Sequence, residues 1–140
     1  MINSFREENF FLSNFYLCPI TYNGLRYTNA ESAFQAQKTL SRDDRIRFAT
    51  LDPASAKKFG RQIALRKDWE DIKLKEMKKI LIAKFSQNLD LAKKLLDTKD
   101  EYLEEGNTWG DKFWGTVNGV GENHLGKILM EIRQQLHENY

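Results

Sequence analysis

The dipeptide Asn23-Gly24 is the feature that most limits how this chain can fold. Residues on both sides of it alternate in character, with Ile20 and Tyr22 before it and Leu25 and Tyr27 after it. Such a pair readily adopts the positive φ angles of a type I′ turn, which joins two antiparallel strands through a two-residue loop. The pattern therefore predicts a β-hairpin over residues 19–29. The aromatic residues 10–19 before it are expected to form a short strand or an ordered loop.

A helix is expected to follow the hairpin at once. Thr28 and Glu31 match the S/T-x-x-E capping box, which predicts a helix from Asn29 to residue 39. Gln35 and Lys38 then lie above Glu31 at i+4 and i+7. Such a stripe of an acid, an amide and an amine faces either solvent or a binding site, and the spacing alone favours solvent.

Further helices are expected from caps and from apolar periodicity. Asp52-Pro53 marks one start, because aspartate caps a helix and proline is tolerated at the first helical position. Gly60 is expected to stop that helix. The longest helix shows an apolar stripe with charged residues elsewhere, and the stripe contains Leu74, Met77, Leu81 and Phe85. The expected ranges are 43–51, 53–59, 68–86, 90–98 and 125–136.

Residues 104–126 differ from the rest of the chain. Most of its glycines and two of its three tryptophans fall in this stretch, which has no helical or strand periodicity. A connection of this length is usually functional or disordered, and the tryptophans argue against disorder. We therefore expect a helix-rich α+β fold, with a small β-hairpin and an ordered Gly/Trp loop, in a single domain over residues 1–140.

Composition excludes several classes of protein. A net charge of +2 in 140 residues is too small to argue for nucleic-acid binding, although a local basic patch stays open. One cysteine, Cys18, forms no internal disulfide, which fits a reducing cytosol and a cytoplasmic location. One cysteine with His124 and His137 makes no zinc cluster, while residue counts leave an all-oxygen Mg²⁺ site open. No signal peptide and no membrane span are expected.

An acid lies between aromatic side chains in "WGDKFWG", residues 109–115. Trp109 and Trp114 flank Asp111, and burial beside tryptophan raises the pKa of an acid toward the range that a general acid needs. The rings also offer a surface on which a flat base can stack. The alternative is that the tryptophans fill the core and Asp111 caps a turn. The residues alone favour neither of these two interpretations over the other.

Polar side chains beside aromatic or glycine residues recur elsewhere. Asn123 precedes the last helix among glycines, where free N–H groups suit a phosphate, although a simple helix cap is favoured. Ser13 and Asn14 are bracketed by aromatic residues and either bind a ligand or form an Asx-turn. The shared theme suits a ligand with a ring and a sugar-phosphate.

The motifs quoted above occur in a longer series that resembles the NADAR family, which is named for a proposed link to NAD and ADP-ribose. The matching pieces cover nearly the whole chain and are, in order, "FLSNFY", "YTNAESAFQAQK", "GRQIALRKDWEDIK", "MKKILIAKF", "LLDT", "WGDKFWG" and "GENHLGKILMEIR". Their order and spacing make the resemblance specific. One departure is Ser32, because the family pattern commonly has histidine after the glutamate.

The resemblance implies hydrolysis of a bond between ribose C1 and a nitrogen. Relatives of this kind act on phosphoribosylamino-pyrimidine intermediates of riboflavin synthesis, or remove ADP-ribose from guanine in nucleic acid. The expected partners are therefore an ADP-ribose-like or phosphoribosyl substrate, or ADP-ribosylated DNA, with no cofactor, no metal cluster and no membrane. The alternatives are a non-catalytic module that binds ADP-ribose or a nucleotide, and a protein-interaction domain that has lost its site.

The same resemblance implies roles for the residues singled out above. Cleavage of the bond builds positive charge on the ribose, which the carboxylate of Glu31 or Asp111 would stabilise. Lys38 would hold phosphate or attack C1 of the opened sugar as a Schiff-base amine. The expected substrate-binding residues, including tryptophans that sandwich the base, are Ser13, Asn14, Phe15, Gln35, Trp109, Trp114, Gly115 and Asn123.

Overall fold

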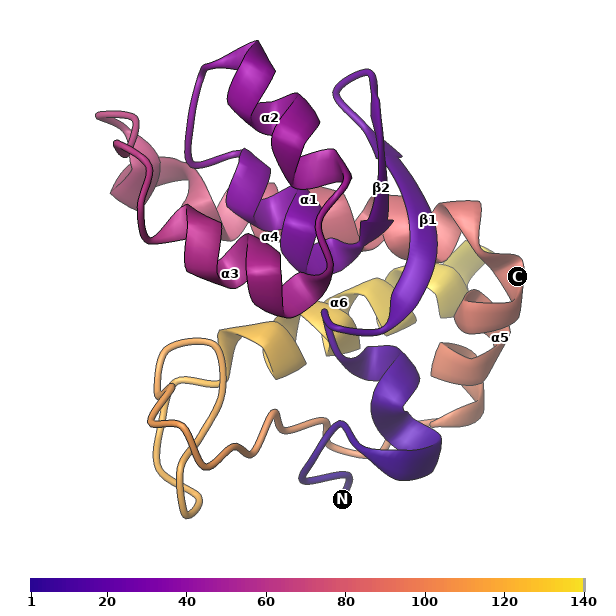
Figure 1. Ribbon diagram of the computed structural model, residues 1–140. Coiled ribbons are helices and arrows are strands. Elements are labelled where there is room, and N and C mark those ends of the chain that lie inside the picture. The colour runs from indigo at the N-terminus through magenta and orange to yellow at the C-terminus, as the bar shows by residue number, and fades with distance from the viewer. Residues whose placement is uncertain (140) are drawn as a thin grey trace. The chain divides into compact units, whose positions relative to one another are not determined.

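A computed structural model describes residues 1–139, which form two compact units (Figure 1). One unit is Asn14–Asn88, and the other joins Met1–Ser13 to the chain from Leu89 onward. The fold is helix-rich α+β with one two-stranded antiparallel hairpin, as predicted. The single domain expected over residues 1–140 stays a prediction. No helix within residues 1–139 has both the length and the apolar character that a bilayer crossing requires.

The hairpin opens the unit Asn14–Asn88 and confirms the prediction from Asn23-Gly24. Strand β1 is Leu17–Tyr22 and strand β2 is Leu25–Asn29, with Tyr22 opposite Leu25. Asn23 has φ of 49° and Gly24 has φ of 79°, the left-handed values that a type I′ turn requires. The tight turn sets the register, so that Ile20 and Tyr27 pair with both side chains buried.

Helix α1, Ala30–Ala36, begins directly after β2, but its cap differs from the prediction. The side chain of Asn29 accepts a hydrogen bond from the backbone N–H of Ser32 at 2.8 Å, so Asn29 is the N-cap and Thr28 is not. Glu31 therefore has no role in a capping box. The helix also ends three residues before position 39. All seven of its residues are buried, so the predicted solvent-facing stripe is wrong.

Three helices enclose α1 within the same unit (Figure 1). They are α2, Arg42–Ala49, α3, Pro53–Gly60, and α4, Trp69–Gln87, and each packs against α1. Asp52 caps α3 as predicted, with its carboxylate 2.7 Å from the N–H of Ser55. In the stripe of α4, Met77, Leu81 and Phe85 are buried, whereas Leu74 is exposed.

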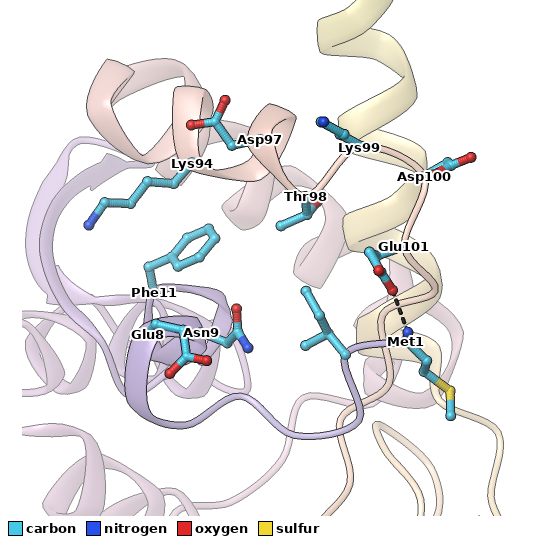
Figure 2. A pocket seen from close by; sticks show the side chains of 11 residues that line it. Met1, Glu8, Asn9, Phe11, Lys94, Asp97, Thr98, Lys99, Asp100 and Glu101 are labelled. Carbon is cyan, nitrogen blue, oxygen red and sulfur yellow. Dashed lines mark ion pairs between the residues drawn. The ribbon is translucent and has the colours of Figure 1, made fainter.

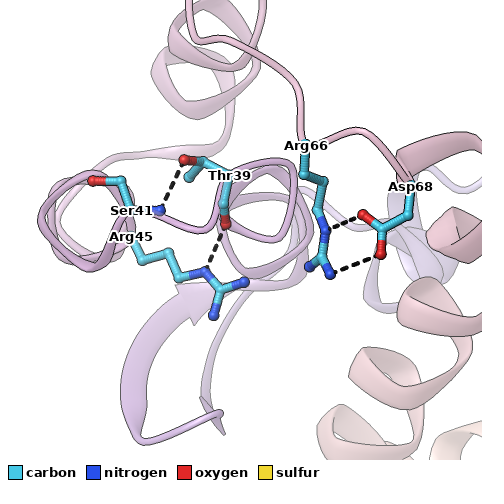
Figure 3. A network of polar contacts seen from close by, with 5 residues as sticks. All are labelled: Thr39, Ser41, Arg45, Arg66 and Asp68. Atoms are coloured by element: carbon cyan, nitrogen blue, oxygen red, sulfur yellow. Dashed lines mark hydrogen bonds and ion pairs between the residues drawn. The ribbon is translucent and has the colours of Figure 1, made fainter.

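Polar contacts hold the chain where it leaves α1 (Figure 3). The guanidinium of Arg45 donates to the carbonyl of Thr39 at 2.9 Å, and the hydroxyl of Thr39 accepts from the N–H of Ser41 at 3.0 Å. The guanidinium of Arg66 pairs with the carboxylate of Asp68, and the backbone N–H of Arg66 donates to the carbonyl of Lys38 at 2.8 Å. These contacts fix the backbone at Lys38 between α1 and α2.

The second unit contains two α-helices and the ordered Gly/Trp stretch. A 3₁₀ helix, Glu7–Leu12, stands where a strand or loop was expected at residues 10–12. Helix α5, Leu89–Asp97, packs against α6, His124–Asn139. Between them, isolated bridges join Gly106 to Thr116 and Val117 to Val120. The loop is therefore ordered by short backbone pairings, as its tryptophans suggested.

The cap of α1 generates a first prediction. Asn29→Ala should lower the free energy of unfolding by about 1 kcal/mol, because an orphan N–H at the helix start loses its acceptor. Thr28→Ala should cost less, because the Thr28 side chain is exposed and its hydroxyl accepts a hydrogen bond from the side-chain amide of Asn29. Urea unfolding of both variants measures the difference. A larger loss in Thr28→Ala would reject Asn29 as the cap.

Candidate active site

Glu31 and Gln35 form a buried polar pair on α1. Only 9% of Glu31 and 5% of Gln35 are exposed. The side-chain Nε2 of Gln35 donates to Oε2 of Glu31 at 2.7 Å, as residues spaced by four on a helix allow. A buried carboxylate is stable only where hydrogen bonds or charges compensate for its lost hydration. The hydrogen bond from Gln35 therefore compensates for part of the hydration that the Glu31 carboxylate loses in the interior of its unit.

Lys38 lies in the turn after α1 and is half-buried. Desolvation lowers the pKa of its amine below the usual lysine value, and the negative charge of Glu31 opposes that shift. The positive charges of Arg61, Lys57 and Lys73 lower the pKa further, by smaller amounts. The amine thus lies within electrostatic range of one carboxylate and three cations. An amine of lowered pKa is a better nucleophile at neutral pH than a free lysine.

Gly60, the last residue of α3, makes room for the amide of Gln35. A Cβ at position 60 would lie 1.9 Å from Oε1 of Gln35 and 2.8 Å from its Cδ. The sequence pattern predicted Gly60 only as a helix stop. Its contact with Gln35 depends on how α3 packs against α1, and no local sequence pattern predicts it.

Asn14 adds a second buried amide beside Glu31. Its backbone carbonyl accepts from the N–H of Glu31 at 3.0 Å, and its side chain, 7% exposed, donates to the sulfur of Met77 at 3.5 Å. Both Oδ1 of Asn14 and Oε1 of Gln35 are buried without a hydrogen-bond partner. Buried acceptors without a partner are uncommon and cost stability, so each of the two calls for an explanation beyond packing.

Ser32 stands where the family pattern commonly has histidine. Its hydroxyl donates to the carbonyl of Leu51 at 2.9 Å, and its N–H donates to the cap residue Asn29. The side chain is fully buried. Ser32 therefore ties α1 to the segment between α2 and α3.

A second buried amine, Lys84, was not singled out from the sequence. It lies on α4 with its Nζ 5.8 Å from the ring centre of Tyr16 and 5.3 Å from that of Phe85. Complete burial lowers its pKa to about 8. The sequence signal for its burial was its position, because Lys84 lies seven residues after Met77 and therefore on the same apolar stripe of the helix.

In the other unit, Asp111 caps a tight turn. Its Oδ1 accepts from the N–H groups of Phe113 at 3.1 Å and Trp114 at 2.9 Å. The side chain of Asn107 holds both the N–H and the carbonyl of Asp111, at 3.0 and 2.9 Å. These contacts match the interpretation of the "WGDKFWG" motif in which Asp111 caps a turn. A catalytic role for Asp111 stays a prediction.

The two tryptophans of this loop have different surroundings. Trp109 is 57% exposed beside Gly110, whereas Trp114 is half-buried. The ring of Trp114 meets Phe113 edge-on, with centroids 4.9 Å apart and planes at 90°, and lies 6.4 Å from His124. A sandwich of a base between Trp109 and Trp114 stays a prediction.

Asn123 and Gly115 are engaged by the protein backbone. The side chain of Asn123, 2% exposed, accepts from the N–H of Glu105 at 3.0 Å and donates to the carbonyl of Leu103 at 2.9 Å. A Cβ on Gly115 would lie 2.0 Å from the carbonyl oxygen of Glu105. Both residues therefore hold the loop together, and their roles in substrate binding stay predictions.

An open pocket of about 750 Å³ lies in the same unit (Figure 2). The 3₁₀ helix, the end of α5 and the residues after it line this pocket, with Phe11 at one side and Lys94 and Thr98 at another. The amine of Met1 pairs with Glu101 at its edge. None of the predicted site residues lines it, so it adds nothing to the site on α1.

The predicted site residues are divided between the two units. Asn14, Phe15, Glu31, Gln35 and Lys38 all belong to the unit Asn14–Asn88. The remaining predicted residues belong to the other unit, and they are Ser13, Trp109, Asp111, Trp114, Gly115 and Asn123. That both sets line one cleft stays a prediction. Within residues 1–139, no three histidine, cysteine or acidic side chains are grouped as metal ligands would be.

Comparison with known proteins identifies relatives of this chain. The chain is 41% identical to N-glycosidase YbiA of Escherichia coli strain K12 over 128 residues, which cover 89% of this chain and 79% of YbiA. It is 40% identical to a riboflavin biosynthesis protein of Vibrio vulnificus over 95% of this chain but only 37% of that longer protein.

A solved structure and a family model agree with these relatives. The NMR structure of E. coli YbiA matches with a TM-score of 0.85 and 36% identity, over 99% of this chain and 88% of that one. The model of the NADAR domain matches residues 3–137. The order of motifs, the fold and the extent of these matches together show that this chain belongs to the NADAR domain family.

Proposed function

We propose that this protein is an N-glycosidase, a hydrolase that cleaves the bond between ribose C1 and a nitrogen. The observation that carries the proposal is the buried Glu31 carboxylate, held by Gln35 and lying within electrostatic range of the Lys38 amine. The name of the YbiA relatives, N-glycosidase, supports the same reaction class. The site residues used here all belong to one compact unit.

Glu31 acts on the ribose in this mechanism. Positive charge develops on C1 as the C–N bond breaks, and a nearby carboxylate stabilises it or takes a proton from the attacking water. In a partly desolvated site this interaction is stronger than it would be in water. Gln35 keeps the carboxylate in place while the charge develops.

Lys38 has two roles that fit its surroundings. As a cation beside Arg61, Lys57 and Lys73, it would bind the phosphate of the substrate. As a neutral amine, it would add to C1 of the ring-opened N-riboside and expel the protonated base nitrogen, leaving an imine between Lys38 and the sugar; water would then hydrolyse that imine, release the sugar and regenerate the amine. The two roles need opposite protonation states and are therefore separable.

The substrate is proposed to be a phosphoribosylamino-pyrimidine or an ADP-ribosylated guanine. Both carry a phosphorylated ribose bonded to a ring or amino nitrogen, which suits a carboxylate beside a cluster of cations. The name of the Vibrio vulnificus relative favours the pyrimidine intermediate of riboflavin synthesis. ADP-ribosylated DNA is the second candidate, and release of free base from each substrate would decide between them.

Glu31→Gln tests the carboxylate. The amide oxygen of the new side chain still accepts from Gln35, so folding and ligand affinity should be kept. Turnover, measured as released base by chromatography, should fall by about 10²–10⁴-fold because the negative charge is lost. The exposed Glu138→Gln is the matched control and should leave turnover unchanged. Wild-type turnover in Glu31→Gln would reject the proposed role.

Lys38→Arg separates the two roles of the amine, because it keeps the charge and removes the nucleophile. If the imine forms, this variant should lose turnover, and borohydride should attach sugar to the wild-type protein only, as mass spectrometry would show. The lowered pKa predicts that wild-type turnover rises with pH and levels off below the usual lysine value of 10.5. The exposed Lys67→Met is the control.

Full activity of Lys38→Arg, with no borohydride adduct on the wild type, would contradict the imine. That result would assign Lys38 to phosphate binding, where a positive charge is sufficient.

A non-catalytic module that binds ADP-ribose is the second candidate, favoured by the large exposed surface of Trp109. ADP-ribose should then quench tryptophan fluorescence, and Trp109→Ala or Trp114→Ala should weaken the binding by removing stacking. Trp69 packs against Phe34 in the other unit and provides a constant background signal. Tight binding without release of base would favour this module over the enzyme, and unchanged fluorescence at millimolar ligand would argue against stacking.

A further inference from the structure

Gln35 and Gly60 together form an arrangement that is unfavourable for stability. Oε1 of Gln35 is buried without a hydrogen-bond partner, which is destabilising for a carbonyl oxygen. Gly60 is the last residue of α3, and at a backbone conformation that alanine can also adopt, glycine is less stabilising because it leaves the unfolded chain more freedom. The protein therefore carries two unfavourable features at one contact, and stability does not explain either of them.

Backbone conformation does not explain Gly60. Its φ is not among the positive values found at the turn glycines, and Arg61 after it continues in the right-handed helical region. What Gly60 provides is space, since a Cβ there would overlap Oε1 and crowd Cδ of Gln35. An alanine would force the amide away from α3.

One contact benefits from both features. With Oε1 placed against Gly60, the amide directs Nε2 toward Glu31 at 2.7 Å. The orientation of the amide is set chemically, because only its N–H₂ group can donate to a carboxylate. Rotating the amide by a half-turn would place two acceptors against each other.

We propose that Gln35 is a positioning residue that fixes the Glu31 carboxylate for the reaction, and that Gly60 is the residue that permits it. The inference rests on the proposed function for its kinetic effect. The hydrogen bond orients the carboxylate and favours its ionised form, since a donor stabilises the charged state of an acid. Glu31 is the catalytic residue, and Gln35 and Gly60 act through it.

The main test is Gln35→Met, which keeps most of the volume of the side chain and removes the N–H donor. Stability to urea at neutral pH should fall moderately, because the buried Glu31 carboxylate loses its donor, while removal of the unpaired Oε1 offsets part of that loss. The turnover number should fall about tenfold with little change in KM. The carboxyl titration of Glu31, followed by carbon NMR of labelled glutamate, should move up by about one pH unit. Glu31→Gln assigns the signal.

Gly60→Ala provides an independent route to the same loss. In the wild-type background it should move the Glu31 titration and lower turnover as Gln35→Met does. In a Gln35→Ala background it should add nothing, because the clashing Oε1 and Cδ are gone and the added methyl group meets only the Cβ of residue 35, at an ordinary 3.5 Å. Additive effects of the two changes would overturn the role given to Gly60.

Gln37→Met is the matched control. Gln37 is also a buried glutamine and directly follows α1. Its Nε2 donates to the backbone carbonyl of Ala33 at 2.9 Å and not to Glu31. Its loss should lower stability and leave the Glu31 titration unchanged. If Gln35 had only a structural role, Gln35→Met would behave like Gln37→Met. Stability would fall, the Glu31 titration would not move, and turnover would drop only because some protein is unfolded. That result in Gln35→Met would overturn the proposal.

The two proposals fail in different ways. If wild-type protein releases no base from either substrate, the N-glycosidase function fails, while the Glu31 titration still tests the contact with Gln35. A shifted titration with unchanged turnover in an active enzyme would overturn the positioning role and leave the reaction class intact.

Discussion

Burial of α1 on all sides is the constraint on which the unit Asn14–Asn88 depends. Seven residues, including a glutamate and a glutamine, lie in the interior between the hairpin and three helices. A buried helix must satisfy the polar groups at its ends within the protein, because water does not reach them. The side chain of Asn29 and the carbonyl of Asn14 do so at the first turn. The helix is therefore a rigid support for whatever it carries.

The electrostatics of the site follow from that burial. Gln35 donates to the buried Glu31 carboxylate, and desolvation lowers the pKa of the half-buried Lys38 amine while the charge of Glu31 opposes that shift. A solvent-facing lysine would keep its ordinary pKa, so the shift of Lys38 is a consequence of this packing.

The polar side chains of the Gly/Trp stretch have structural contacts of their own. Without regular secondary structure, its backbone N–H and carbonyl groups need other partners, and side chains supply them. Asn107 and Asp111 close one turn, and Asn123 joins the start of α6 to residues 103–105. Gly115 and Gly126 permit the close backbone approaches that result. These residues therefore have structural roles in the loop, their roles in binding and catalysis stay predictions, and Trp109 is the most exposed aromatic side chain of the motif.

The amino-acid sequence by itself determined the hairpin, the order of the helices and the family. These depend on local chemistry, such as the positive φ values at Asn23-Gly24 and the cap at Asp52, and on the succession of motifs along the chain. The cap of α1 was misplaced by one residue because Thr28 and Asn29 both suit that position, and only the path of β2 into the helix selects Asn29.

Tertiary structure alone decided what the polar stripe of α1 faces. Helical spacing places Glu31, Gln35 and Lys38 on one side, but it carries no information on whether protein or water covers that side. Packing of α3 against α1 buries the stripe and brings Gly60 to Gln35, 25 positions apart in the sequence. The properties of the site arise from this packing, because desolvation and close approach depend on neighbours that are distant along the chain.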